Sequence, residues 1–245
     1  MSKEKAVEVY STQVPAFIAA KTGPARGMEE VTAADIIIPR VELIQALSPA
    51  RDKKDPAYIE GAEEGMMYNN VTKALYGTEV HVVPVVYRKQ WLIWKDRKLG
   101  GGANGFRGAF ATELEAKKHI AELGEEGLDT VETAQHFCLI ISGNNVEEAV
   151  VSMGKTKLKV SRRWNSLMRL AGGDSFERVY KLAPVVEVNA RNEKYYNFGV
   201  TQVGYVTADL FARAEALYEQ VSSGRVVASQ DFDVQGEVVS DNTEF

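Results

Sequence analysis

The chain has 245 residues, a formal net charge of −5, 45% hydrophobic residues and 26% charged residues. These values are typical of a globular protein with one elaborated domain or two small ones. No apolar run reaches the roughly 18 residues that a membrane-spanning helix requires, and the N-terminus lacks an apolar signal segment. A single cysteine, Cys138, excludes an internal disulfide framework and is typical of a reducing compartment. We therefore expect a cytoplasmic protein without a membrane partner.

The first third of the chain predicts an arm followed by strands. Residues 1–34 are weakly patterned and predict an irregular N-terminal arm. Residues 35–45 are rich in β-branched side chains and predict a strand. Two further buried strands are expected over residues 80–86 and 91–94, which have the sequences VHVVPVV and WLIW. A basic turn at residues 87–90 is expected to separate them.

The middle of the chain predicts a flexible stretch, a helix and two strands. Residues 99–109 contain five glycines and are expected to be flexible. Thr112 begins a capping box, and the helix that follows should end at Gly124. Residues 131–142 and 149–153 then predict two neighbouring strands, joined by a glycine-asparagine turn.

The last third predicts two helices around a strand pair. Residues 157–171 have apolar side chains at helical spacing, with a glycine pair as the stop. Residues 179–189 and 195–206 predict paired strands, and Thr207 should cap a helix that stops near Gly224. Strands dominate, so we expect an α+β domain with an antiparallel sheet or an OB-like, partly closed barrel, elaborated with inserted helices, over residues 35–224.

Motifs for catalysis are not found in the sequence. The glycine-rich residues 100–105 lack the lysine-serine or lysine-threonine ending of a phosphate-binding loop and the context of a dinucleotide fingerprint. Cys138 lies in an apolar strand pattern, and His81 and His136 lie in similar runs, where core or surface roles are the default. One cysteine and three scattered histidines are too few ligands to indicate a zinc site. We expect no catalytic residue, metal or cofactor.

Aromatic and basic side chains alternate in two stretches, residues 87–110 and 162–198. Single-stranded nucleic acid is bound by such pairs, because cations follow the phosphates and aromatic rings stack on bases at about 1–3 kcal/mol each. The alternative is that the aromatics are core residues, which we favour for Trp94, Trp164 and Phe198. The candidate DNA-binding residues are Tyr87, Arg88, Lys89, Trp91, Lys95, Arg97, Lys98, Phe106, Arg107, Lys155, Lys157, Lys159, Arg162, Arg163, Arg191, Lys194, Tyr195 and Tyr196.

The charge is unevenly distributed along the chain. Residues 230–245 hold five carboxylates and no lysine or arginine, which equals the whole formal excess. Residues 153–194 hold ten bases against four acids. This polarisation predicts a flexible acidic tail over residues 225–245 and basic surfaces on the body. The alternative for the tail is a frayed terminus without a role.

The terminal residues Asp241, Asn242, Thr243, Glu244 and Phe245 resemble the C-termini of bacterial and bacteriophage single-stranded DNA-binding proteins. Those proteins place an oligonucleotide-binding (OB) barrel first and an acidic tail ending in phenylalanine last. Residues 35–105 of this chain are also similar in pattern to phage DNA-binding proteins. The resemblance implies that Asp241, Glu244 and Phe245 recruit phage replication proteins such as a polymerase, helicase or primase.

Our leading hypothesis is a sequence-nonspecific single-stranded DNA-binding protein that supports phage DNA replication or recombination in the host cytoplasm. We expect a homodimer without enzymatic activity. One alternative is a metal-dependent nuclease, in which Glu42, Asp96 and Glu187 would converge. A recombination or annealing mediator is another alternative, and a phage structural or protein-binding protein is a third.

Overall fold

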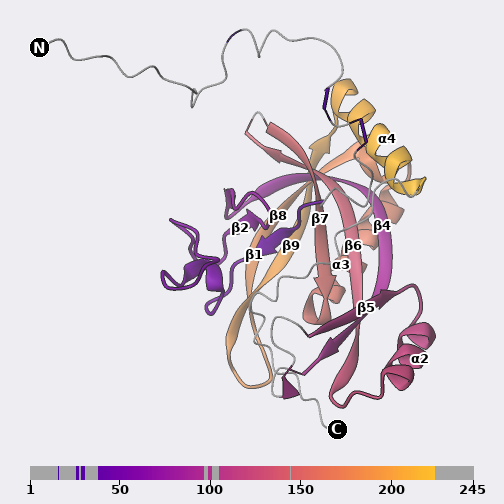
Figure 1. The fold of residues 1–245 in the computed structure, drawn as a ribbon. Helices are drawn as coiled ribbons and strands as arrows, with labels where there is room; N and C mark the ends of the chain where they lie inside the picture. The colour runs from indigo at the N-terminus through magenta and orange to yellow at the C-terminus, as the bar shows by residue number, and fades with distance from the viewer. Residues whose placement is uncertain are drawn as a thin grey trace, which may run out of the picture. The chain divides into compact units, whose positions relative to one another are not determined.

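The fold is α+β, with two antiparallel sheets and three α-helices in the part of the chain that the structure describes (Figure 1). The chain divides into two compact units, residues 1–32 and 33–245, and every element described below belongs to the second. A computed structural model describes residues 16, 26, 27, 29, 30, 38–96, 99, 100, 105–143 and 145–223.

The main sheet has six strands in the order β7-β6-β4-β8-β9, with β5 paired to β4 beside this path. All pairs are antiparallel. Its strands are β4 (Val80–Lys95), β5 (Phe106–Phe110), β6 (Leu128–Ser142), β7 (Asn145–Gly154), β8 (Arg178–Val188) and β9 (Lys194–Tyr205). A smaller sheet is formed by β1 (Val41–Leu43), β2 (Met67–Asn69) and β3 (Leu75–Gly77).

Strand β4 is continuous where the sequence predicted a basic turn. β6 pairs with nearly its whole length, and a bulge between Pro84 and Val86 accommodates the proline in the ladder. The predicted turn at residues 87–90 was wrong. Tyr87 and Lys89 are exposed while the residues between and after them are half-buried, which is the alternation of a strand with one open face.

Two of the three helices confirm the threonine caps that the sequence predicts. The Thr112 hydroxyl accepts from the Glu115 backbone N–H, and the Glu115 carboxylate accepts from the Thr112 backbone N–H, as in a capping box. Gly124 ends this helix in the left-handed region at φ 62°. Thr207 caps the last helix by accepting from the Leu210 N–H. The helices are α2 (Glu113–Leu123), α3 (Leu158–Ala171) and α4 (Ala208–Ser222).

The two faces of the main sheet carry separate hydrophobic cores. On one face, Trp164 of α3 packs with side chains from β4, β6, β7, β8 and β9, and β1 and β2 also contribute. Cys138 is buried in this core, which confirms it as a small core residue. On the other face, Leu217 and Val221 of α4 pack with Val85 of β4 and with residues of β6 and β7. Helices α3 and α4 therefore cover opposite faces.

The segment around β1 contacts both edge strands of the main sheet. At β7, the Val150 N–H donates to the Pro39 carbonyl at 2.8 Å, and Arg40 forms an isolated bridge with Val150. At β9, the Gln45 side chain donates to the Tyr196 carbonyl at 2.9 Å and accepts from the Tyr196 N–H at 2.8 Å. In the described part of the chain, no continuous ladder joins β7 to β9, so no closed barrel is formed.

Candidate nucleic-acid interface

Helix α3 presents a basic outer face. Its sequence LKVSRRWNSLMRLA contains no acidic residue. Lys159, Arg162, Arg163 and Arg169 are all exposed, and at about 100° per residue they fall within one arc of the helix. Trp164, on the opposite side, is fully buried. Among the described residues, no carboxylate lies within ion-pair distance of Arg163 or Arg169.

Glu132 on β6 joins this face to the exposed side of β4. Its carboxylate lies 3.4 Å from Nη2 of Arg162 and 3.7 Å from Nζ of Lys89. Glu132 is directly opposite Trp91 in the β4–β6 register, and Nζ of Lys89 lies 6.0 Å from the Trp91 ring centroid. Two bases share one carboxylate here, so the local charge remains positive beside a half-exposed indole.

Glu187 on β8 joins the start of α3 to the β8–β9 hairpin. It accepts from Nζ of Lys159 at 2.7 Å, from the Tyr195 hydroxyl at 2.5 Å and from Nδ2 of Asn197 at 3.1 Å. Partial burial raises the pKa of Glu187, but these three hydrogen bonds outweigh it and hold the pKa below its ordinary value. Glu187 is therefore ionised at neutral pH, and it fixes Tyr195 beside Lys159.

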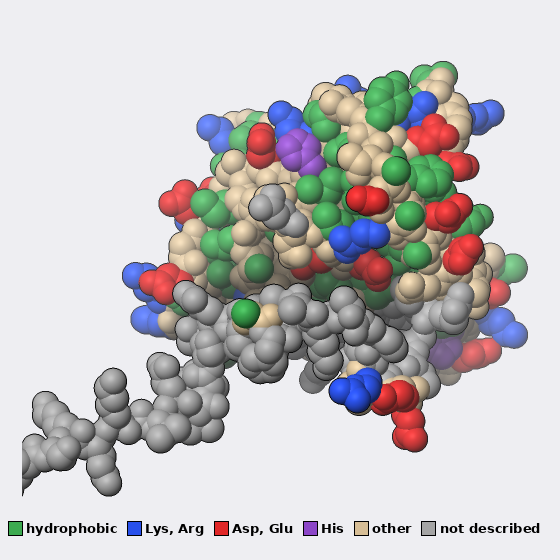
Figure 2. Space-filling model, turned by 90° about the horizontal axis from the view of Figure 1, so that it is seen from above, with side chains coloured by type: hydrophobic (Ala, Val, Ile, Leu, Met, Phe, Trp, Pro, Cys, Tyr) green, Lys and Arg blue, Asp and Glu red, His purple; other side chains and the backbone are tan. Residues whose placement is uncertain are grey.

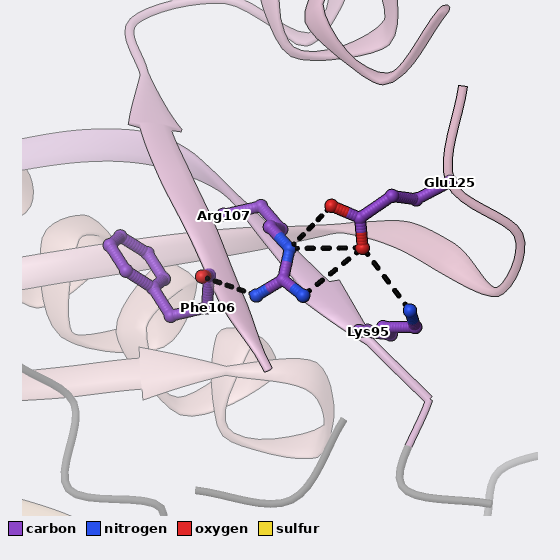
Figure 3. Close-up of polar contacts among 4 residues, drawn as sticks. All are labelled: Lys95, Phe106, Arg107 and Glu125. Atoms are coloured by element: carbon purple, nitrogen blue, oxygen red, sulfur yellow. Dashed lines mark hydrogen bonds and ion pairs between the residues drawn. The ribbon is translucent and has the colours of Figure 1, made fainter. Parts of the chain in front are cut away.

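Glu125 organises a third cluster at the far end of β4 (Figure 3). The Nε of Arg107 lies 3.0 and 3.2 Å from its two carboxylate oxygens, and Nη2 lies 3.1 Å from one of them. Nζ of Lys95 approaches the same carboxylate at 3.2 Å. Hydrogen bonds from Arg107 and then Lys95 lower the pKa of Glu125 below its ordinary value.

Four aromatic side chains line the β4–β5 pair. Trp91 lies directly opposite Phe110 in the register, and the Trp94 and Phe106 rings are 5.3 Å apart. All four are half-buried, so part of each ring is open to solvent. The prediction of flexibility was wrong for residues 106–109, because they form β5. This pairing supplies aromatic surface next to the bases of β4 and β5.

Tyr87 belongs to an aromatic stack that leads into the core. Its ring, on an exposed residue, meets His136 edge-on at 5.2 Å, and His136 stacks on Trp164 at 4.5 Å. The Nε2 atom of His136 lies 2.8 Å from the Ser161 hydroxyl. Burial lowers the pKa of His136 to about 3, so the imidazole is neutral at physiological pH. Trp164 is a core residue, as the sequence predicted, and His136 is buried beside it.

Three predicted DNA-binding residues are directed into the structure. Arg88 donates to the Val221 carbonyl at the end of α4, and its guanidinium lies 5.6 Å from the Phe137 ring. Lys157 is buried, with Nζ 5.6 Å from the Phe198 ring. The Tyr196 side chain packs against the α3-face core, and its backbone N–H and carbonyl are hydrogen-bonded to the Gln45 side chain. Because these side chains have structural partners, we leave Arg88, Lys157 and Tyr196 out of the interface.

The remaining candidates lie at separate places on the surface. Lys155 precedes α3, while Arg191 and Lys194 lie at the tip of the β8–β9 hairpin, and all three are exposed. On the face drawn in Figure 2, basic and acidic side chains are interspersed rather than gathered in one basic patch. The candidates that lie outside the described residues are Arg97, Lys98, Asp241, Glu244 and Phe245.

The structure does not assemble the carboxylates of the nuclease alternative. Glu42 pairs with Arg40 at 3.2 Å on β1, Asp96 follows β4, and Glu187 is bonded to Lys159 as described. Among the described residues, no group of three or more His, Cys, Asp or Glu side chains lies close enough to hold a metal ion.

No helix in the described part of the chain has the length and apolar character needed to span a membrane.

Comparison with known proteins identifies the family. A family model for Pam3 phage gp34-like proteins matches residues 3–227. The chain belongs to this family. Membership in the gp34-like family associates the chain with bacteriophage proteins, as the sequence resemblance implied, and the match includes every helix and strand described above. Residues 228–245, most of the predicted acidic tail, lie outside the match. Searches of curated proteins and of solved structures gave no match.

Proposed function

We propose that this gp34-like protein binds single-stranded DNA without sequence preference, through the outer face of α3 and the adjoining side of β4. One observation carries the proposal. A helix with four exposed bases and no acid is joined through Glu132 to the half-exposed Trp91. The DNA phosphates would contact the basic side chains of α3, while the nucleobases would stack on Trp91 and neighbouring rings.

The ion pairs at this surface are compatible with such a ligand. Glu132 and Glu187 neutralise only part of the charge of Lys89, Lys159 and Arg162. Exposed ion pairs contribute only about 0–1 kcal/mol each, so phosphates can replace these carboxylates at small cost. Binding should therefore be strong at low salt and fall steeply as salt rises.

An OB-like, partly closed barrel is part of the proposal. It is supported by the core on the α3 face, which takes side chains from both edge strands and from β1. The hydrogen bonds of Gln45 to Tyr196 and of Val150 to Pro39 hold β1 against those two edges. OB domains bind single strands across such a curved sheet.

The acidic tail and the partners complete the proposal. Residues 225–245 would occupy the basic surface in the absence of DNA and, through Asp241, Glu244 and Phe245, recruit phage replication proteins in the host cytoplasm. We also propose a homodimer. Removal of residues 230–245 should raise the affinity for single-stranded DNA at low salt and abolish partner binding. Unchanged affinity and unchanged partner binding would contradict the role of the tail.

Charge neutralisation on α3 tests the proposed surface. The double variant Arg163→Gln/Arg169→Gln should weaken binding of a fluorescein-labelled thymidine oligonucleotide about tenfold or more at about 50 mM salt, because two phosphate contacts are lost. The matched control Lys53→Gln/Lys54→Gln removes two exposed charges from the loop before β2. Equal effects of the two double variants, measured by fluorescence anisotropy, would contradict an α3 interface.

A further inference from the structure

We infer that Lys95 and Arg107 form a phosphate-binding site whose occupant in the free protein is the Glu125 carboxylate (Figure 3). The inference deepens the proposed function, on which it rests, because the phosphate is a phosphodiester of the bound single strand. Glu125 then acts as an internal competitor that DNA displaces.

The geometry of the cluster is that of an anion site. Arg107 directs Nε and Nη2 at the carboxylate, in the fork that also matches a phosphate group. Its Nη1 donates to the Phe106 carbonyl at 3.1 Å, which fixes the plane of the guanidinium. Lys95 adds a second positive charge at 3.2 Å from the carboxylate. Among the described residues, the Glu125 carboxylate is within ion-pair distance of both Lys95 and Arg107.

The two bases are held more firmly than the acid. Lys95 ends β4, where its backbone N–H donates to the Gly105 carbonyl at 2.8 Å, and Arg107 lies within β5. Glu125 instead lies in the short loop between α2 and β6, between Gly124 at φ 62° and Gly127 at φ 74°. Rotation of the Glu125 side chain moves the carboxylate away from the two basic residues, while the Gly127 carbonyl keeps its hydrogen bond from the Asp96 N–H at 2.8 Å.

Exchange of the carboxylate for a phosphate is also chemically easy. The Glu125 side chain is 32% exposed, and its lowered pKa keeps it charged, so it becomes hydrated as soon as it leaves the bases. Ion pairs at such exposed sites are weak. The Trp94 and Phe106 rings, 5.3 Å apart, belong to the residues that precede Lys95 on β4 and Arg107 on β5.

Removing the competitor tests the inference. Glu125→Gln should tighten binding of a labelled thymidine oligonucleotide about three- to tenfold at low salt, because the phosphate no longer competes with a carboxylate. Glu126→Gln is the matched control, since it removes the same charge from the next, exposed residue, and it should change affinity less than about twofold. Arg107→Gln should weaken binding and reduce the magnitude of the negative slope of log K against log salt by about 0.7.

The double variant separates local competition from a general change of charge. In Glu125→Gln/Arg107→Gln the gain in oligonucleotide affinity produced by Glu125→Gln should disappear, because the guanidinium that binds the phosphate is gone. If Glu125→Gln binds no tighter than Glu126→Gln, or if the double variant keeps the gain, the inference is wrong and the α3 interface still stands. Thermal unfolding monitored by circular dichroism checks that each variant is folded, and Lys95→Gln replaces Arg107→Gln if the latter is not.

If the protein binds no oligonucleotide at all, the proposed function is refuted. Binding of a smaller anion then tests whether Lys95 and Arg107 form a phosphate site. Sodium pyrophosphate is titrated into Glu125→Gln, and tryptophan fluorescence, to which Trp94 next to Lys95 in the sequence contributes, reports binding. Saturable binding that is lost in Glu125→Gln/Arg107→Gln supports a phosphate site formed by Lys95 and Arg107. The same response in both variants, or no response in either, overturns it.

Discussion

The two faces of the main sheet use neighbouring basic residues of β4 in opposite ways. Arg88 points to the α4 face, where it donates to the Val221 carbonyl and lies over the Phe137 ring. Lys89, the next residue, points to the α3 face, where it is exposed between Glu132 and Trp91. Because side chains alternate along a strand, a basic run divides into a structural and a solvent-exposed set. On α3 the division follows the 3.6-residue period of a helix, which places the buried Trp164 on the side opposite its basic residues.

The largest effect is expected from loosening α3. Trp164→Ala should destabilise the protein by about 3–5 kcal/mol, because it empties a fully buried site stacked on His136. Urea unfolding measures the change. Leu170→Ala is the control on the same helix, since Leu170 is 85% exposed, and it should cost less than about 0.5 kcal/mol. Similar losses in the two variants would show that α3 is not seated on the sheet as described.

The comparison between Arg88 and Lys89 gives the next effect. Arg88→Gln should destabilise the protein by about 1–3 kcal/mol, because it removes a charged donor from the end of α4 and breaks the contact with Phe137. Lys89→Gln should leave stability within about 0.5 kcal/mol and weaken oligonucleotide binding instead. Paired measurements of urea unfolding and anisotropy test both. If Arg88→Gln weakens binding more than Lys89→Gln, the assignment of the two faces is wrong.

The smallest effect concerns the pH dependence of stability at Glu187. Its pKa is lowered in the folded protein, so its contribution is present above the ordinary glutamate pKa and is lost as the pH falls through the folded value. At pH 7 the free energy of unfolding of the wild type should exceed that of Glu187→Gln by about 1 kcal/mol or less. The difference should vanish as the pH falls below that folded value. A difference that grows on acidification would contradict the pairing with Lys159 and Tyr195.

Local signals in the sequence were sufficient to predict the helices and most strands. Threonine caps at Thr112 and Thr207, the glycine stop at Gly124 and the apolar spacing around Trp164 depend only on residues a few positions apart. The α+β class follows from the order of these elements. The turn expected at residues 87–90 failed because a half-exposed strand and a polar turn have similar composition.

The carboxylates that organise the candidate interface were not predicted. Glu132 lies 30 residues from Arg162, Glu187 lies 28 from Lys159, and Glu125 lies 18 from Arg107. Such pairs depend on strand register and on how α3 crosses the sheet, which local spacing does not specify. The inward direction of Lys157 depends on the same tertiary packing. Charge counts along the sequence therefore overstated the number of free bases.

Salt-dependent binding of poly(dT), followed by tryptophan fluorescence, tests the central claim most directly. Trp91 lies beside Lys89 on the proposed surface, so bound bases should quench its emission. We predict quenching at about 50 mM salt and a slope of log K against log salt of about −3 or steeper, because the four exposed basic residues of α3 alone each neutralise a phosphate at about −0.7. Absence of quenching at that salt concentration, or an affinity independent of salt, would contradict single-stranded DNA binding by this face.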